Sequence, residues 1–150
     1  MRPARLARPA RNAGFTLLEM IVVLVIIGLI MGLIGPRLFG QADRAKLQTA
    51  ETQVKMLRGA LETMRLDIGR YPSAQEGLGI LALAPSDPKL ATRWRGPYID
   101  GPVPNDPWSN AYRYDTAPSA FGAFSLYSLG TDGEPGGEGD AADVGLMPIR

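Results

Sequence analysis

The chain has none of the residue sets that are typical of a catalytic centre. Histidine and cysteine are both absent from its 150 residues. Histidine is the commonest general base and metal ligand, and cysteine supplies nucleophiles, disulfides and soft metal ligands. No G-x-S-x-G nucleophile motif is present either. Enzymatic activity is therefore not expected, and the protein should act by binding or assembly.

The densest cluster of reactive side chains lies between Leu129 and Val144, in the segment LGTDGEPGGEGDAADV. Its five carboxylates have no basic residue among them: Asp132, Glu134, Glu138, Asp140 and Asp143. This composition is typical of a solvated loop, whereas carboxylate and carbonyl oxygens between glycines could bind calcium. The spacing fits neither an EF-hand nor a calcium-binding repeat. Spacing alone favours the solvated loop and leaves calcium as the alternative.

A single carboxylate, Glu19, interrupts an apolar run from Phe15 to Ile34. The sequence T-L-L-E fits a capping box in which Glu19 accepts from the amide of Thr16, and the helix dipole favours such a carboxylate by about 0.3–1 kcal/mol. A charge at mid-membrane costs about 2.5–3.5 kcal/mol on insertion scales. The cap and a functional partner in another chain therefore explain Glu19 equally well.

The apolar run has the length of a membrane-spanning helix. As a helix, residues 15–35 would span roughly 30 Å, which is the thickness of one hydrocarbon core. A secretory signal peptide is the alternative, but its apolar region should be shorter, about 7–15 residues, and should end at an A-x-A site. Here the run continues through Gly32 to Pro36. A retained transmembrane helix is preferred.

Charge is segregated along the chain. The net charge is +1, but removing the first fourteen residues leaves 12 basic side chains against 15 acidic ones, a net charge of −3. No general basic surface remains, which speaks against nucleic acid as a partner. The arginines before the apolar run favour a cytoplasmic amino end, and in a bacterium the carboxyl-terminal part would then be periplasmic. The basic residues after the run, which weaken this bias, are Arg37, Arg44 and Lys46.

Residues 36–71 are predicted to continue the helix as an amphipathic segment. Pro36 should kink or stop a helix, but the pattern beyond it favours continuation, and Gly69 and Pro72 then supply a stop. With fewer than four heptads and no consistent flanking charges, the apolar stripe fits a face that covers the protein's own core better than a coiled coil. The stripe consists of Leu47, Ala50, Val54, Leu57, Leu61, Met64, Ile68 and Tyr71.

Residues 72–150 contain 10 prolines and 11 glycines, which excludes long regular elements. A short helix is expected at 78–83 and an irregular loop at 85–107. Two strands are predicted, at 111–115 and 121–129, which would form a small antiparallel sheet on the helix stripe. The fold class is therefore α+β. The expected packing anchors of the loop are Trp94, Tyr98 and Trp108.

The segment GFTLLEMIVVLVIIGLI resembles the amino terminus of type IV pilin-like proteins, with a basic leader ending in Gly14, then Phe15, and glutamate at the fifth mature position. Pro36 falls at the kink proline of that family. Beyond it, GRYPSAQEGL, RWRGPYID, NDPWSNAYRY and YSLGTDGEPGGEG resemble, in this order, the major pseudopilins of type II secretion systems. The resemblance covers nearly the whole chain after Gly14 and implies a pilin-like fold.

The resemblance implies that residues 1–14 are a leader that prepilin peptidase removes between Gly14 and Phe15, followed by N-methylation of Phe15. Glu19 would then meet the new amino group of a neighbouring subunit. It also implies a non-catalytic subunit that assembles with itself and other pseudopilins into a periplasmic filament. An inner-membrane platform with its cytoplasmic ATPase would build the filament, which drives export of folded proteins across the outer membrane.

Major pseudopilins carry a calcium site in the carboxyl-terminal loop, and the resemblance assigns it to Asp132, Asp143 and the carbonyl of Leu129. Calcium thereby becomes the preferred interpretation of the acidic loop. The chain departs from the family at two places. Ser125 stands where the family usually has an aspartate, and the ending VGLMPIR lacks the usual tryptophan.

Three alternatives belong to other classes. A type IV pilus subunit commonly carries a carboxyl-terminal disulfide, which a chain without cysteine cannot form. A membrane-tethered periplasmic enzyme would need a nucleophile and base or a water-activating metal. A membrane-anchored periplasmic binding domain predicts that Glu19 can be replaced without consequence.

Overall fold

A computed structural model describes residues 14–149, with the side chains of 36–39 and 140 excepted. The helix α1 (Leu17–Ile68) runs through 52 residues and passes Pro36 without ending. The chain divides within this helix into two compact units, one ending at Gly40 and the other beginning at Gln41. The leader predicted at residues 1–14 lies outside the described residues apart from Gly14.

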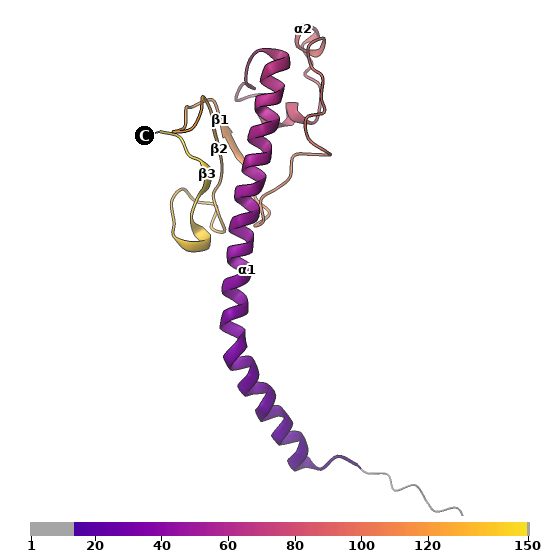
Figure 1. The fold of residues 1–150 in the computed structure, drawn as a ribbon, viewed down its shortest axis with the longest axis vertical. Coiled ribbons are helices and arrows are strands. Elements are labelled where there is room, and N and C mark those ends of the chain that lie inside the picture. The colour runs from indigo at the N-terminus through magenta and orange to yellow at the C-terminus, as the bar shows by residue number, and fades with distance from the viewer. Residues whose placement is uncertain (1–13, 150) are drawn as a thin grey trace, which may run out of the picture. The chain divides into compact units, whose positions relative to one another are not determined.

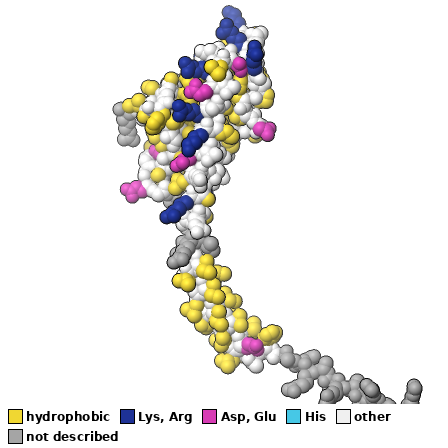
Figure 2. Space-filling model, in the orientation of Figure 1, with side chains coloured by type: hydrophobic (Ala, Val, Ile, Leu, Met, Phe, Trp, Pro, Cys, Tyr) yellow, Lys and Arg dark blue, Asp and Glu magenta, His cyan; other side chains and the backbone are white. Residues whose placement is uncertain are grey.

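The amino-terminal unit is the apolar part of α1. It is long and apolar enough to cross a membrane, with a mean hydropathy of 3.0 over its most apolar window, and none of that window is buried within the chain. Figure 2 shows hydrophobic side chains covering the visible face of this part of the helix. An apolar helix surface of this kind is the type that a membrane or another protein surface covers.

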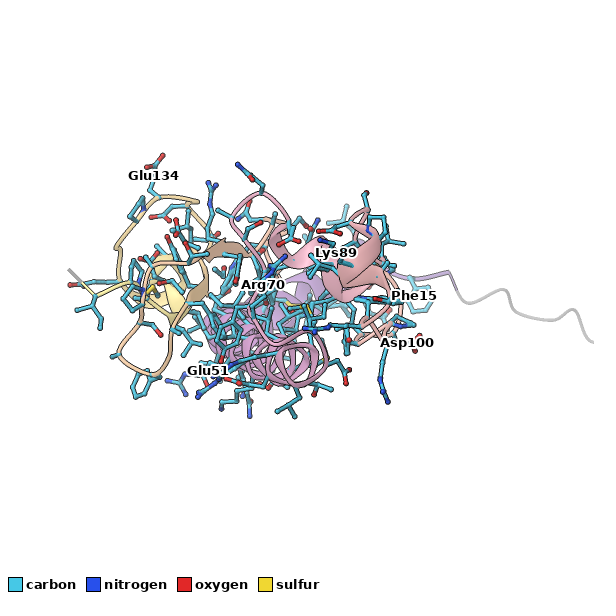
Figure 3. The ribbon with its side chains drawn as sticks, turned by 90° about the horizontal axis from the view of Figure 1, so that it is seen from above. Phe15, Glu51, Arg70, Lys89, Asp100 and Glu134 are labelled. Atoms are coloured by element: carbon cyan, nitrogen blue, oxygen red, sulfur yellow. The ribbon has the colours of Figure 1, made fainter. Side chains whose placement is uncertain are left out.

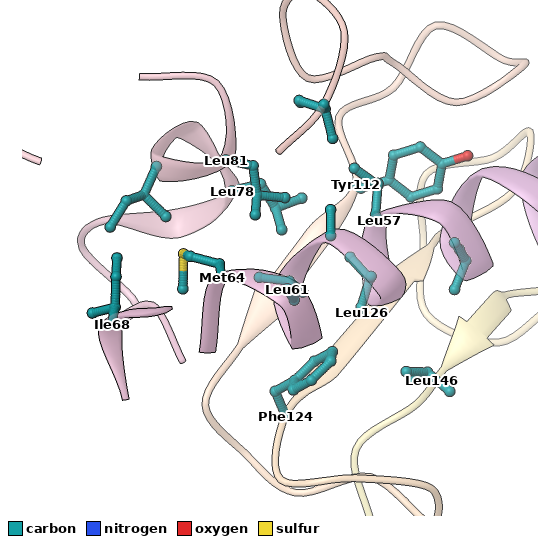
Figure 4. Close-up of a cluster of buried hydrophobic side chains, with 14 residues drawn as sticks. Leu57, Leu61, Met64, Ile68, Leu78, Leu81, Tyr112, Phe124, Leu126 and Leu146 are labelled. Atoms are coloured by element: carbon teal, nitrogen blue, oxygen red, sulfur yellow. The ribbon is translucent and has the colours of Figure 1, made fainter. Parts of the chain in front are cut away.

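The second unit is organised around the carboxyl-terminal part of α1 (Figure 1). Six of the eight predicted stripe residues, from Ala50 to Ile68, are buried on this helix, and Leu57, Leu61 and Met64 are fully buried. Leu47 is only half-buried, and Tyr71 lies beyond the end of the helix. The three fully buried side chains form the centre of a core that also includes Leu81, Phe124, Leu126 and Leu146 (Figure 4). The interpretation of the stripe as a cover for the protein's own core is confirmed.

The helix ends at Ile68, because Gly69 adopts a φ of +90°, a left-handed conformation that favours glycine. A 3₁₀ helix, η1 (Gly77–Leu81), stands where residues 78–83 were expected to be helical. The predicted irregular loop at 85–107 contains one helical turn, α2 (Pro88–Ala91). Asp87 caps α2 by accepting a hydrogen bond from the amide of Lys89 at 2.8 Å.

Two of the three predicted anchors pack against the core. The rings of Trp94 and Tyr98 meet edge to face with centroids 5.8 Å apart. Trp94 Nε1 donates to the carbonyl of Ile80 at 2.9 Å, and Tyr98 Oη donates to Asp67 at 3.0 Å. Trp108 is half-buried but lies outside this core cluster.

The sheet is antiparallel in the order β1-β2-β3, whereas only two strands were predicted. The strands β1 (Arg113–Asp115) and β2 (Ser125–Ser128) are shorter than the predicted ranges, because Ala111 forms only an isolated bridge and residues 121–124 precede the ladder. The strand β3 (Val144–Leu146) was not predicted. Its Gly145 has a φ of +133° and a built Cβ would lie 2.5 Å from Leu126 O, so the register requires glycine.

Candidate assembly and metal-binding sites

The amino end of α1 carries the predicted processing residues and Glu19, one of the two predicted assembly residues. The other, Pro36, lies further along the helix, and its side chain is outside the described ones. Gly14 and Phe15 are exposed, and Thr16 caps the helix by accepting from the amide of Glu19 at 3.2 Å. The reciprocal bond of a capping box, from the amide of Thr16 to the Glu19 carboxylate, is not formed within residues 14–149. Glu19 itself is exposed. Only half of the predicted capping box is present. The Glu19 carboxylate takes no part in the cap and stays available for another partner.

The predicted calcium residues lie along the loop between β2 and β3. Leu129 is buried, whereas Asp132 is exposed and accepts from the amide of Glu134 at 3.1 Å. Glu134 points away from the rest of the molecule at the loop's outer edge (Figure 3). The carboxylate of Asp132 is therefore oriented by a local turn and faces solvent.

Asp143 closes this loop. Its amide donates to the carbonyl of Gly136 at 3.2 Å, and its Oδ2 accepts from the amide of Gly136 at 2.9 Å. Its other oxygen, Oδ1, is buried and has no hydrogen-bond partner. A buried carboxylate oxygen without a donor is costly, and a hard cation such as calcium would satisfy it. In this respect the residues present fit a calcium ion.

The described side chains contain no group of three or more acidic residues placed to hold one metal ion. Ser125, which stands at the position of a family aspartate, donates its hydroxyl to the carbonyl of Ala117 at 2.7 Å. Any calcium site would therefore draw on backbone carbonyls such as that of Leu129, besides the two aspartates.

An ion pair that the sequence did not reveal anchors the turn after α1. Arg70 binds Glu76 through two hydrogen bonds of 2.7 and 2.8 Å, and Glu76 also accepts from the amide and hydroxyl of Ser73. The bond with Arg70 lowers the pKa of Glu76 to about 2. These residues belong to the segment GRYPSAQEGL. No signal in the sequence pointed to the pairing itself.

Two tyrosines, the buried Tyr112 and the half-buried Tyr114, have pKa values shifted upwards. Burial raises the pKa of Tyr112 to about 12, with a smaller contribution from Asp106, and burial likewise raises that of Tyr114 to about 12. Tyr112 donates to Gln53 at 2.6 Å and Tyr114 to the carbonyl of Pro72 at 2.8 Å. Both pKa values thus lie further from neutral pH than usual. This is expected for hydroxyl groups whose hydrogen bonds connect residues 112 and 114 to the helix and to the turn after it.

Comparison with known proteins agrees with these features. The family described as "Type II secretion system (T2SS), protein G" matches residues 37–147, and the "Prokaryotic N-terminal methylation motif" matches residues 9–35. The type II secretion system core protein G of Vibrio cholerae is 39% identical over 93% of this chain and 94% of its own length. Its counterpart from Escherichia coli K12 is 40% identical over 91% and 93%.

A solved structure shows the same fold. The crystal structure of the major pseudopilin from the type 2 secretion system of enterohaemorrhagic Escherichia coli is 31% identical, with a TM-score of 0.57. The match covers 73% of this chain and 92% of the other. The α+β, pilin-like fold class is therefore confirmed. The chain belongs to the protein G family of type II secretion systems.

Proposed function

We propose that the protein is the major pseudopilin of a type II secretion system, a structural subunit of the pseudopilus. The observation that carries this proposal is the match of protein G relatives over nine tenths of the chain, with the methylation motif at its amino end. The helix α1 supports it, because none of the residues 14–149 covers its apolar part. Such a helix serves first as a membrane anchor and then as the packing element of a filament.

Processing and location follow from the same proposal. Prepilin peptidase removes the leader between Gly14 and Phe15, and Phe15 is N-methylated. The subunit waits in the inner membrane with its amino end in the cytoplasm and residues 41–149 in the periplasm. It then assembles with further copies and with other pseudopilins, on an inner-membrane platform driven by an ATPase, to export folded proteins.

Glu19 is the proposed assembly contact. Its carboxylate has no partner within residues 14–149. Cleavage would expose an amino group at Phe15 of a neighbouring copy, and this positively charged group could pair with the carboxylate. Between two packed apolar helices this pair would be shielded from water, where truncating one partner typically costs about 2–5 kcal/mol. The neutral amide of the capping turn offers no comparable interaction.

The test is Glu19→Ala in a secreting cell. We expect the variant to insert in the membrane and to be processed, which mass spectrometry would show as an N-methylated Phe15. Filament assembly, measured by cross-linking, and secretion should fall at least about tenfold, since tenfold corresponds to only about 1.4 kcal/mol. Glu51→Ala is the matched control, because Glu51 is an exposed carboxylate on the same helix that pairs with Lys55 at 4.0 Å.

Normal secretion by Glu19→Ala would contradict the assembly role and favour an anchored binding domain. An intact leader on the mature protein would contradict the prepilin processing. The second candidate, a type IV pilus subunit, predicts filaments on the cell surface rather than loss of secretion.

We also propose one calcium ion at the acidic loop, held by Asp132, Asp143 and the carbonyl of Leu129. The buried, unpartnered Oδ1 of Asp143 supports it, because that oxygen lacks a donor in the folded chain. Bound calcium would neutralise the loop's carboxylates and join its two ends. With calcium at about 100 times its Kd, the expected stabilisation is about 2.7 kcal/mol.

The calcium proposal is tested by thermal unfolding of the mature protein in detergent micelles, with calcium or with EGTA. We expect calcium to raise the Tm of the wild type and to have little effect on Asp143→Asn. Glu134→Gln removes an acidic side chain of the same loop that points outward, so it should keep the response. A wild-type Tm that is the same in EGTA would leave the acidic segment as a solvated loop.

A further inference from the structure

Asp106 is a carboxylate buried without a cation. It is 4% exposed, and no lysine or arginine pairs with it within residues 14–149. A buried charge is costly unless hydrogen bonds replace its water. Its Oδ1 accepts from the amides of Trp108 and Asn110 at 3.0 and 2.7 Å, and its Oδ2 accepts from the hydroxyl of Ser128. The carboxylate thus joins the turn at 106–110 to the end of β2.

Ser128 connects Asp106 to the start of the acidic loop. The side chain is fully buried, and its single hydroxyl proton is committed to Asp106. Its oxygen can therefore only accept from the other side, and it accepts from the amide of Gly130 at 3.1 Å. Asn110, from the same turn, donates its Nδ2 to the carbonyl of Gly130 at 3.1 Å. Both polar backbone groups of Gly130 are held in this way.

Holding Gly130 also fixes the carbonyl of Leu129. The Leu129 carbonyl and the Gly130 amide belong to one planar trans peptide unit, so they point in opposite directions. The amide points to Ser128, and the carbonyl must therefore point away from Asp106 and Ser128. Gly130 has a φ of +64°, which favours glycine at this turn from the strand into the loop.

We propose that Asp106 and Ser128 are positioning residues for the calcium loop. Asp106 orients the hydroxyl of Ser128, and Ser128 holds the Leu129–Gly130 peptide so that the Leu129 carbonyl is aimed before any ion arrives. This inference rests on the proposed calcium site. Neither side chain is a ligand, and their contribution is pre-organisation: the carbonyl does not have to be ordered when calcium binds.

The experiment compares calcium affinity, measured by titration calorimetry on the mature full-length protein in detergent micelles. Ser128→Ala removes the acceptor of the Gly130 amide, and we expect about 10- to 100-fold weaker calcium binding, as for other outer-shell partners of metal ligands. Ser128→Thr keeps the hydroxyl and should bind within a few fold of the wild type. Restoration by Thr separates positioning from a general effect of the substitution.

Tyr112→Phe is the control for stability alone. It removes a part-buried hydrogen bond to Gln53 next to β1, and its hydroxyl forms no hydrogen bond with Gly130 within residues 14–149. It should lower the Tm in EGTA, as Ser128→Ala does, and leave the calcium affinity unchanged. A Ser128→Ala variant that binds calcium as tightly as the wild type would overturn the positioning role and leave the calcium site standing. A wild type that binds no calcium would overturn both.

Discussion

The pair Arg70–Glu76 shows how a single interaction can determine the course of the chain after α1. The carboxylate binds the guanidinium through both oxygens and also accepts two bonds from Ser73. The side chains are 41% and 24% exposed, so water screens part of the attraction. The geometry still holds residues 70–76 in one turn, and that turn leads into η1, whose Leu81 is fully buried.

The effect of this pair on stability should depend on pH. The pKa of Glu76 is about 2 in the folded chain against 4.5 ordinarily. Its contribution is therefore complete above pH 4.5 and is lost as the pH falls from 4.5 towards 2. After allowance for screening, we expect Glu76→Gln to lower the free energy of unfolding by about 1–2 kcal/mol at pH 6. The difference from the wild type should shrink towards pH 2.5 in urea titrations.

Glu51→Gln is the control, since Glu51 forms only an exposed pair with Lys55. It should change the unfolding free energy by less than about 0.5 kcal/mol at either pH. If the difference between the wild type and Glu76→Gln were equally large at pH 2.5 and pH 6, the ion pair would not be its source.

At the scale of elements, the sequence predicted what local patterns determine. The period of the apolar stripe identified the buried face of α1, because every third or fourth residue of a helix shares one side. Gly69 and Pro72 were expected to stop the helix after residue 71, and it ends at Ile68, just before Gly69. The strand β3 could not be predicted in this way, since three residues with a central Gly145 have no strand propensity of their own and pair only with β2.

The same distinction applies to the residues of the candidate site: some were predicted from the sequence, and others were found only in the structure. Asp132 and Asp143 were found from composition and from the resemblance, and Glu19 from its position in an apolar run. Asp106 and Ser128 were missed, because 22 residues separate them and each type is common in turns and on surfaces. Only the folded backbone brings them together. Buried polar contacts between distant segments leave no periodic signal in a sequence.

At the scale of the whole molecule, the chain separates anchoring from folding. The unit ending at Gly40 exposes its apolar side chains, whereas the unit from Gln41 onward has a core of its own. The proposed assembly would need this division, since the apolar helix would exchange lipid for neighbouring helices while the second unit stays folded. A core mutation and a mutation of Glu19 should therefore fail in different assays.

Leu61→Ala tests this separation. Leu61 is fully buried at the centre of the core, and Leu66, on the same helix, is 86% exposed. Truncating a buried leucine leaves a cavity, so we expect the free energy of unfolding to fall by about 2–5 kcal/mol, measured by urea titration in micelles. Leu66→Ala should cost less than about 0.5 kcal/mol. Below the reduced Tm, Leu61→Ala should still be inserted, processed and N-methylated at Phe15, unlike a variant that fails at the membrane. If it were unprocessed although folded, the two units would not act separately.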